Sequence, residues 1–401
     1  MSDESRPDGA APVDLQEEWR GMQRRLVADL AGDQNGDLGK APFLLDSRVY
    51  TDAARFDAER KRLFRDVPLL VAFAEELAAP GDRVLFDAAG PPILVVRGRD
   101  GVLRAFLNQC THRAARLVSD CEPSRQLLCP FHGWVYDLDR RLRSVPHAAA
   151  FEGIDRERRG LTPVPVAEWG GMVFVRARPG DEPIDVEGFL GPIAPLLAAL
   201  DLGRLRQVCA DRIDVAANWK LALDMGREVY HVPVVHRDSL APNLHPTAAI
   251  FDTYGRHNRF SGASRSLEAL VGVPEAEWPE TPYQAVHYLF PNTTLSFTHV
   301  FDGQTPVVTM SRVFPGESIG EGMTLMATYG RSDAPDVADE QVAAMHQAVL
   351  GIVGGEDYGA AASVWQTLKH GVAPPGLVLG RNETLVERYH RDVADYIGMP
   401  L

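Results

Sequence analysis

The sequence predicts an α+β protein in which a small antiparallel β domain precedes a larger domain of antiparallel sheet and helices. Short apolar or alternating runs, separated by turn residues, fill residues 69–176, as is typical of antiparallel strands. A second alternating segment covers residues 283–329. Three runs with helical spacing follow it, at residues 338–353, 357–369 and 382–396.

Length, charge and cysteine content limit the possible classes of protein. The 401 residues are enough for two domains, and the 45% apolar content is ordinary for a globular protein. The formal net charge of −14 argues against nucleic acid and anionic membranes as partners. The four cysteines indicate no disulfide framework, and no signal peptide or membrane-spanning run is visible. We therefore expect a cytoplasmic protein that binds neither membrane nor nucleic acid.

Helices are predicted on both sides of the β domain. Residues 1–15 are polar and contain Pro and Gly, so we expect them to be disordered. Residues 15–30 have helical spacing with mixed charges and predict an amphipathic arm. Residues 52–64 predict a helix with Asp52 as its N-cap. After the β domain, residues 188–200 predict a further helix.

The strands predicted within the small domain are short and separated by turns. Residues 134–136 and 142–145 predict a closing hairpin around a turn at residues 137–141. The other predicted strands are at residues 83–86, 92–97, 103–108, 164–167 and 171–176. This pattern gives a β domain of roughly a hundred residues, an ordinary domain size.

Two short motifs within residues 108–136 can bind metal. Cys110-x-His112 is followed, after sixteen residues, by Cys129-x-x-His132. Two such turns facing each other can hold a [2Fe–2S] cluster, with both cysteines on one iron and both histidines on the other. Imidazoles in place of two thiolates raise the reduction potential above that of an all-cysteine ferredoxin.

Cysteine and histidine also bind Zn²⁺, so a structural zinc site is one alternative, and four unrelated core residues are another. Zinc knuckles usually space their paired ligands by two or more residues, which argues against zinc at Cys110-x-His112. The spacing resembles the Rieske iron–sulfur motif. Respiratory Rieske proteins add a disulfide beside the ligands, but Ala115 and Phe131 stand at those places. The resemblance therefore implies the disulfide-free type of oxygenases and their ferredoxins.

A second set of candidate ligands is formed by Glu228, His231 and His236. If residues 224–231 are helical, Glu228 and His231 share a face, whereas His236 diverges on an unbroken helix. Pro233 predicts a bend that could bring both imidazoles to one metal. Two histidines and one carboxylate form the facial arrangement of mononuclear non-haem Fe(II) sites. The same spacing is also common among ordinary core or surface histidines.

Together, these stretches resemble the catalytic alpha subunit of Rieske non-haem iron oxygenases, the aromatic-ring-hydroxylating oxygenase family. The resemblance covers about residues 45–400. Besides the cluster motif, it includes Tyr50-Thr51-Asp52, Leu63-Phe64, the run 95–108, Asn218-Trp219-Lys220 and Glu228-x-Tyr230-His231-x4-His236. It implies a small antiparallel β Rieske domain and a larger helix-grip (START-like) catalytic domain. The predicted boundaries are an N-terminal arm at 1–44, the Rieske domain with its preceding helix at 45–178, and the catalytic domain at 179–401.

The resemblance also implies roles for acidic residues. The third iron ligand of the family is an Asp from a downstream acidic cluster, which matches Asp357, with Glu356 as the second choice. As residues that open a predicted helix, these carboxylates could equally interact with the helix dipole. Glu228 holds the position that links the first iron histidine to a cluster histidine of the neighbouring subunit, His132 or His112. The family therefore implies inter-subunit electron transfer in a homotrimer or an α3β3 assembly.

Three positions depart from the family pattern. Asp224 replaces the Asn common seven residues before the first iron histidine, and Ala114 replaces the Gly that usually follows His-Arg in the first cluster turn. Lys369 replaces a Gln near the end of the late helix. None of the three removes a ligand, but Asp224 could place a carboxylate near the iron.

The resemblance implies the terminal oxygenase component of a multicomponent system. Each subunit would hold one [2Fe–2S] cluster and one Fe²⁺, and electrons from NADH would arrive through a partner reductase, with or without a ferredoxin. The enzyme would use O₂ to hydroxylate or dihydroxylate an aromatic or other small hydrophobic substrate. The implied ligands are Cys110, His112, Cys129 and His132 for the cluster, and His231, His236 and Asp357 for the iron.

The substrate pocket would be lined by residues 240–310, where aromatic residues are frequent. Most of them fit an ordinary sheet core. An apolar pocket suits an aromatic substrate, whereas an aromatic cage with a carboxylate suits the N-demethylation of a quaternary ammonium compound such as carnitine or betaine. The aromatic residues are Phe251, Tyr254, Phe260, Trp278, Tyr283, Tyr288, Phe290, Phe297 and Phe301.

Two other classes of protein are compatible with parts of the sequence. An electron carrier with only the cluster is opposed by the length of chain after the β domain, which contains the second set of ligands. A zinc-stabilised binding protein would be colourless, whereas a protein with the iron–sulfur cluster would be red-brown.

Overall fold

The structure, a computed structural model, describes residues 13–33, 35–299, 306–333, 339–372, 374 and 376–401. The chain forms two compact units. The small unit comprises Phe64–Phe189 and Asp201–Arg206. The large unit comprises the described residues up to Leu63, Leu190–Leu200 and Gln207–Leu401. The predicted boundary differs here, because residues 45–63 group with the large unit. Most of the stretch expected to be disordered, residues 1–12, lies outside the described residues.

The small unit contains three antiparallel sheets, with strand orders β10-β11-β2, β3-β4-β5-β9 and β6-β7-β8. Each predicted strand has a counterpart, and the predicted closing hairpin is the pair β7–β8. The strands are β2 (Leu69–Phe73), β3 (Arg83–Phe86), β4 (Ile93–Arg97), β5 (Leu103–Leu107), β6 (Leu127–Leu128), β7 (Val135–Tyr136), β8 (Leu142–Ser144), β9 (Pro163–Val164), β10 (Val166–Trp169) and β11 (Met172–Val175). Short 3₁₀ turns are η1 (Ala74–Leu77), η2 (Ala148–Phe151), η3 (Glu157–Arg159) and η5 (Leu202–Arg204).

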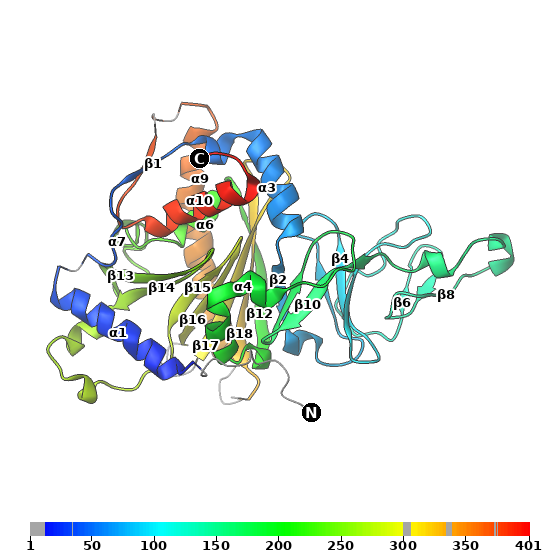
Figure 1. The fold of residues 1–401 in the computed structure, drawn as a ribbon, viewed down its shortest axis with the longest axis horizontal. Coiled ribbons are helices and arrows are strands. Elements are labelled where there is room, and N and C mark those ends of the chain that lie inside the picture. The colour runs from blue at the N-terminus through cyan, green and yellow to red at the C-terminus, as the bar shows by residue number, and fades with distance from the viewer. Residues whose placement is uncertain (1–12, 34, 300–305, 334–338, 373, 375) are drawn as a thin grey trace. The chain divides into compact units, whose positions relative to one another are not determined.

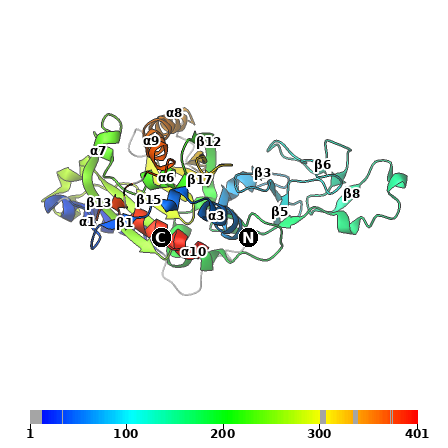
Figure 2. The same ribbon diagram turned by 90° about the horizontal axis from the view of Figure 1, so that it is seen from above.

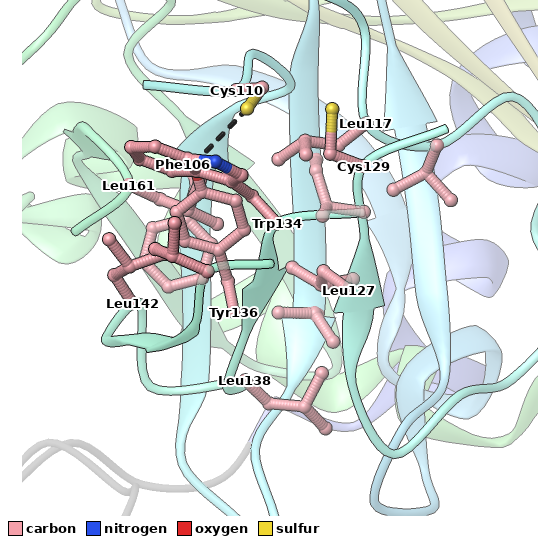
Figure 3. Packing of buried hydrophobic residues seen from close by; sticks show 14 residues of the cluster. Phe106, Cys110, Leu117, Leu127, Cys129, Trp134, Tyr136, Leu138, Leu142 and Leu161 are labelled. Atoms are coloured by element: carbon pink, nitrogen blue, oxygen red, sulfur yellow. Dashed lines mark hydrogen bonds between the residues drawn. The ribbon is translucent and has the colours of Figure 1, made fainter. Parts of the chain in front are cut away.

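One hydrophobic cluster supports the metal-binding turns of the small unit. It includes side chains of β4 and β5 together with Trp134, Tyr136 and the two cysteines Cys110 and Cys129 (Figure 3). Tyr136 has no exposed surface and Trp134 only 3%. Because well-packed interiors hold side chains in single rotamers, this cluster fixes the positions of both cysteines.

The large unit is built on a seven-stranded sheet with the order β12-β18-β17-β16-β15-β14-β13. From β13 to β18 the neighbouring strands pair antiparallel, which agrees with the predicted α+β class. The strands are β12 (Leu205–Val215), β13 (Leu244–Tyr254), β14 (His257–Ser264), β15 (Ala285–Leu289), β16 (Thr293–His299), β17 (Pro306–Pro315) and β18 (Gly322–Arg331). A separate two-stranded ribbon pairs β1 (Phe43–Leu45) with β19 (Leu377–Leu379).

The helices agree with most of the predicted positions. They are α1 (Leu15–Ala31), α2 (Arg48–Thr51), α3 (Ala53–Asp66), α4 (Val186–Leu190), α5 (Ala194–Ala199), α6 (Trp219–Met225), α7 (Val232–Val235), α8 (Asp339–Gly351), α9 (Tyr358–Leu368) and α10 (Thr384–Ile397). Short 3₁₀ turns are η4 (Gly191–Ile193), η6 (Arg265–Leu270) and η7 (Glu275–Glu277). The single helix predicted over 188–200 is instead broken, because Gly191 adopts a φ of +55° between α4 and α5.

The predicted amphipathic arm is a helix of the large unit. In α1, Trp19, Met22, Leu26 and Leu30 are buried against the sheet residues of β13 and β14. Figure 1 shows α1 beside β13. The side chain of Asp14 caps the helix by accepting from Gln16 N–H. The spacing of three to four residues puts the apolar side chains on one face, so packing stabilises this helix.

One face of the large sheet points toward α6, α8 and α9, which Figure 2 shows on one side of the strands. Thr328 Oγ1 lies 2.8 Å from His346 Nδ1 of α8. Thr324 on the same strand contacts the hydroxyl of Tyr358 at the start of α9. Alternate residues of a strand share a face, so these contacts identify the side of the sheet that faces the candidate iron ligands.

A buried ion pair fixes α6 against α3. Lys220 Nζ lies 2.5 Å from Glu59 Oε2, and Trp219 Nε1 donates to the same oxygen over 3.1 Å. The side chains of Lys220 and Glu59 are at most 1% exposed. Removing either charge would leave the other buried and unpaired, at a cost of about 3–5 kcal/mol. The helix that precedes the candidate iron histidines is therefore held rigidly.

Candidate metal centres

Two turns with the same hydrogen-bond pattern carry the cysteine and histidine pairs. Ala114 N–H donates to Cys110 O over 3.0 Å, and Cys110 N–H donates to Ala115 O over 2.8 Å. In the second turn, Gly133 N–H donates to Cys129 O over 3.0 Å, and Cys129 N–H donates to Trp134 O over 2.8 Å. The fourth residue after each cysteine is left-handed, with φ of +62° at Ala114 and +69° at Gly133. Each turn thus directs its cysteine side chain toward the interior of the small unit.

The two candidate cysteine ligands are buried, whereas the two candidate histidine ligands are more exposed. Cys110 and Cys129 are each 2% exposed, and their sulfur atoms lie at the same end of the packed cluster in Figure 3. The rings of His112 and His132 are 4.7 Å apart. Burial raises the pKa of the Cys110 thiol and lowers the pKa of His112. A thiolate here therefore needs a bound cation, while the imidazole is ready as a neutral ligand.

Aromatic side chains orient the two histidines. The ring of His112 stacks on Trp134, with centroids 4.8 Å apart and an interplanar angle of 6°. The ring of His132 lies 3.7 Å from that of Phe131, at an angle of 35°. Phe131 is 56% exposed, so the histidine edge of the site faces outward.

Two further residues support the cluster site, and the motif spacing did not reveal them. The hydroxyl of Tyr136 accepts from Thr111 N–H over 3.0 Å and lies 3.2 Å from Cys110 Sγ, to which it can donate. The side chain of Asn108 is 1% exposed and accepts from Leu117 N–H and Val118 N–H. Tyr136 lies at the end of the stretch 108–136 that carries both motifs, and this closeness was the available signal for it.

The donor set fits a [2Fe–2S] cluster. Two buried sulfurs and two adjacent imidazoles are the ligands that such a cluster takes when histidines replace two cysteines. A hydroxyl that can donate a hydrogen bond to sulfur is one of the groups that tune the reduction potential of such clusters. The cluster itself is not part of the structure, and the fit rests on these side chains alone.

Residues 224–231 do not form one helix, so the condition under which Glu228 and His231 would share a helical face is not met. Helix α6 ends at Met225, with Gly226 as its C-cap, and Glu228 and His231 lie in the turn that follows. The bend therefore occurs at Gly226, while Pro233 stands in the first turn of the short helix α7. Gly can leave the helical conformation at little cost, whereas Pro is well tolerated in a first turn.

The structure brings His231, His236 and Asp357 together. One ligand atom from each lies within 4.8 Å of the other two. Asp357 Oδ1 is 3.0 Å from His236 Nε2 and 3.4 Å from His231 Nε2. His236 is 2% exposed and Asp357 9%. Two imidazole nitrogens and a carboxylate oxygen that face one point form a donor set for Fe(II).

Asp357 does not open a helix, contrary to the expectation. Helices α8 and α9 are continuous through a π-helical segment, Ile352–Asp357. The idea that these carboxylates interact with a helix N-terminus therefore does not apply, because the backbone amides ahead of Asp357 already belong to a helix. Such π segments are frequent at functional sites.

Each of these two candidate iron histidines has a second carboxylate on its other ring nitrogen. His231 Nδ1 contacts Glu228 Oε1, and Glu228 Oε2 accepts from His231 N–H over 3.1 Å. His236 Nδ1 lies 2.5 Å from Glu356 Oε2. Burial lowers the pKa of His231, but its hydrogen bonds with Asp357 and Glu228 outweigh burial and raise the pKa to about 9. The site therefore attracts a cation, either a proton or a metal ion.

Asp224 does not join this ligand group. Its Oδ2 accepts from the Tyr50 hydroxyl over 2.7 Å and lies 3.0 Å from His390 Nε2. Asp224 is 6% exposed and His390 1%. The carboxylate that replaces the usual amide thus takes part in a buried network between α2, α6 and α10.

Few of the predicted pocket aromatics face the iron ligands. The cross-strand row Phe251–Phe260–Val286 lies on the sheet face that also carries Tyr288 and the threonines near α8 and α9. The hydroxyl of Tyr288 bonds the carbonyl of Gly226. The other pocket candidates among the described residues lie on the opposite face or off these strands, and Phe301 lies outside the described residues.

Comparison with known protein families matches each of the two regions to a family model. Residues 67–165 match the Rieske [2Fe-2S] domain, and residues 202–399 match the ring hydroxylating alpha subunit (catalytic domain). The chain is 33% identical over 219 residues to the glycine betaine monooxygenase oxygenase subunit of Chromohalobacter salexigens, covering 54% of this chain and 47% of that protein. It is 32% identical over 196 residues to the carnitine monooxygenase oxygenase subunit of Escherichia coli, covering 48% and 52%.

A dioxygenase subunit is also similar. The chlorobenzene dioxygenase subunit alpha of a Cupriavidus species is 26% identical over 277 residues, covering 66% of this chain and 59% of that protein. The chain thus matches about half the length of the first curated relatives.

Two solved structures share the fold over nearly the whole chain. A quaternary ammonium Rieske monooxygenase in complex with L-carnitine has a TM-score of 0.74 at 22% identity, covering 92% of this chain and 98% of that one. Naphthalene 1,2-dioxygenase from a Rhodococcus species has a TM-score of 0.71 at 20% identity, covering 96% and 99%. At these identities the likeness concerns the fold. Among the described residues, no helix has the length and apolar character needed to cross a bilayer.

Proposed function

Because the chain belongs to the family of Rieske oxygenase alpha subunits, we propose that it is the terminal oxygenase of a multicomponent system. The observation that supports this most directly is the convergence of His231, His236 and Asp357 on one point. When bound, the [2Fe–2S] cluster would supply electrons one at a time and the ferrous iron would activate O₂. The electrons would originate from NADH and reach the chain through a partner reductase, with or without a ferredoxin.

The side chains around the iron ligands would orient and isolate the site. Glu228 would be the electron-transfer bridge between His231 and a cluster histidine, His112 or His132 of the partner subunit. Its contact with His231 Nδ1 supports this role, because it leaves Nε2 free to face the iron. The assembly would be a homotrimer or an α3β3 complex, since the bridge requires a neighbouring copy.

The first substrate class in this proposal is an aromatic or other small hydrophobic compound that gains one or two hydroxyl groups. Phe251 and Phe260 support it, because they form an aromatic row on the sheet face that carries Tyr288. Val229 on the loop before His231 lies against the same face, 3.7 Å from the position of a Cβ at Gly262. An apolar wall near the iron would exclude water and hold a flat ring.

The second substrate class is a quaternary ammonium compound. It is favoured by the similarity to oxygenase subunits of glycine betaine and carnitine monooxygenases. The iron-facing side of the sheet also carries hydroxyl residues, among them Ser311 and Thr294, which suit a polar substrate better than a pure arene. Hydroxylation of an N-methyl group would release formaldehyde and leave a tertiary amine.

A substrate panel with NADH and a surrogate reductase tests the proposal. The panel pairs monocyclic arenes with trimethylammonium compounds, and products are followed by mass and by formaldehyde release. Gain of one or two oxygens identifies the first class, and loss of a methyl group with formaldehyde identifies the second. The His231→Ala variant should lose turnover and mononuclear iron while it keeps the visible spectrum of the cluster. Turnover and full iron content in that variant would show that the site is misassigned.

A further inference from the structure

We propose that Glu356, held by Ser239, is a positioning residue that sets the orientation and donor strength of His236 and so the metal affinity of the mononuclear centre. The inference rests on the proposed iron site. It assigns Glu356 a role different from that of a substitute ligand, and it adds Ser239 to the residues on which the centre depends.

The imidazole of His236 lies between two carboxylates from consecutive residues. Its Nδ1 is 2.5 Å from Glu356 Oε2, and its Nε2 is 3.0 Å from Asp357 Oδ1. The two ring nitrogens of an imidazole point in different directions, so the two carboxylates cannot share one metal ion at this ring. Because Asp357 is the carboxylate grouped with both histidines, the metal belongs on the Nε2 side and Glu356 lies behind the ring.

The two carboxylates lie at the end of the π-helical segment Ile352–Asp357. Consecutive residues of a helix point in different directions, about 100° apart in a regular α-helix, so two of them can approach opposite sides of one ring. A π turn inserts an extra residue and changes the directions of the side chains around it. The segment thus presents Glu356 and Asp357 to opposite nitrogens of the same buried imidazole.

Ser239 fixes the carboxylate of Glu356. Its hydroxyl donates to Glu356 Oε2 over 2.7 Å, the same oxygen that faces His236 Nδ1. The N–H of Ser239 donates to His236 O over 3.2 Å, so the serine and the histidine are also joined through the backbone. The side chain of Glu356 is 35% exposed, and without this hydroxyl it could turn toward solvent.

With the Nδ1 hydrogen bond directed to Glu356 Oε2, Nε2 is the ring nitrogen left to bind a metal ion. The lone pair of Nε2 then faces Asp357 Oδ1, and two acceptors 3.0 Å apart favour a cation between them. Glu228 does the same for His231, whose Nε2 is 3.4 Å from Asp357 Oδ1. Carboxylates behind metal-binding histidines raise ligand basicity, and their removal costs about 10–100-fold in metal affinity.

The test measures metal binding in full-length protein that holds its cluster but has been depleted of mononuclear iron by a chelator. Co²⁺ is the probe, and its affinity is determined by anaerobic competition with a chromophoric chelator. With the cluster oxidised and therefore silent in electron paramagnetic resonance, the Co²⁺ signal reports the symmetry of the site. Glu356→Ala should weaken Co²⁺ binding by about 10–100-fold and change that signal.

Graded variants separate positioning from general damage. Glu356→Gln keeps an oxygen that can accept from Nδ1, so its affinity should lie between those of the wild type and Glu356→Ala. Ser239→Ala should cause a smaller loss in the same direction. Glu340→Ala removes an exposed carboxylate of α8 in the same helical run and should leave Co²⁺ affinity and signal unchanged.

The outcomes distinguish this inference from the proposed function. Wild-type Co²⁺ affinity and an unchanged signal in Glu356→Ala would overturn the role of Glu356, while loss of binding in His236→Ala would still support the iron site. Undiminished Co²⁺ binding in His236→Ala would overturn the iron site itself. Equal losses in Glu356→Ala and Glu340→Ala would show a general charge effect and also overturn the positioning role.

Discussion

The two candidate metal centres are built from the chain in different ways. The four cluster residues come from two similar turns that are close in sequence, and backbone hydrogen bonds within each turn place its cysteine. The three iron ligands come from distant segments, and Asp357 reaches His236 through a π-helical segment between α8 and α9. A centre made of local turns can be recognised from spacing, whereas the second centre depends on how helices pack on a sheet.

The support around the ligands differs in the same way. Aromatic rings surround the cluster residues and pack against them, and one tyrosine hydroxyl can donate a hydrogen bond to a cysteine sulfur. Carboxylates stand behind both iron histidines, Glu228 at His231 and Glu356 at His236. The first environment suits a group that only exchanges electrons, and the second concentrates negative charge where a dication is to be held.

The largest effect expected from this contrast is selective loss of one centre. His236→Ala should remove mononuclear iron and turnover, with a loss of metal affinity well beyond the ~10–100-fold typical of residues behind the ligands. Cys129→Ser should remove the visible spectrum of the cluster. Iron analysis and absorption spectra of both variants provide the measurement.

Each of these variants also serves as the control for the other. Cys129→Ser should still bind Co²⁺ at the second centre, and His236→Ala should keep the cluster spectrum. If His236→Ala bleached the cluster, the two centres would depend on each other for folding, and their separate construction would be refuted.

A second prediction concerns the pH dependence of the large sheet. Burial, with Arg259 nearby, lowers the pKa of His287 to about 3. The unfolded chain, with an ordinary pKa of about 6.5, binds this proton more readily, so stability falls as pH drops from about 6.5 toward 3. The loss should approach about 1.4 kcal/mol per pH unit within that window. Urea unfolding of wild type and His287→Phe at several pH values measures it.

The phenylalanine keeps a ring beside Tyr283 and Phe297 but has no proton to gain. Its unfolding free energy should therefore fall less steeply in acid than that of the wild type. Parallel curves for the two proteins would contradict a neutral, buried His287.

The third prediction tests the tyrosine hydroxyl at the cluster. Tyr136→Phe removes the donor 3.2 Å from Cys110 Sγ, and a lost hydrogen bond to sulfur should lower the reduction potential. If the bond favours the reduced cluster by about 1 kcal/mol, the shift is on the order of 50 mV for one electron. Potentiometric titration of the cluster measures the shift, and retained iron content shows that the site is intact. A potential equal to that of the wild type would show that the hydroxyl does not donate to sulfur.

The smallest effect compares the two cluster turns with each other. Ala114 and Gly133 occupy equivalent left-handed positions, and only the first carries a Cβ. Ala114→Gly relieves backbone strain of about 1–2 kcal/mol in the folded state. It also stabilises the unfolded chain by about 0.4–1 kcal/mol through greater conformational entropy, so a net stabilisation of the folded state by about 0.5–1 kcal/mol is expected. Thermal loss of the visible cluster band provides the measurement.

The opposite change is the matched control. Gly133→Ala adds a Cβ at φ +69° that would meet Pro146 Cγ at 3.3 Å, so it should destabilise the second turn. Equal effects of the same sign in the two variants would contradict the equivalence of the turns.

Much of the secondary structure followed from local patterns. The strands of the small unit, the alternating segment of β15–β18 and the positions of α1, α3 and α10 agree with periodicity and capping signals. The misplaced elements are those in which the signal was ambiguous. Gly191 interrupts the helix predicted at 188–200, and Gly226 ends α6 well before Pro233, the residue from which a bend was expected.

The sequence by itself determined which residues could bind metal, because thiolates, imidazoles and carboxylates have ligand chemistry that does not depend on the fold. It also determined the cluster turns, since a cysteine and a histidine in one tight turn are neighbours by covalent geometry alone. Only the tertiary structure decided that Asp357 faces both iron histidines while Glu356 lies behind one of them. The direction of a side chain on a helix changes with one inserted residue, and no local pattern records that insertion.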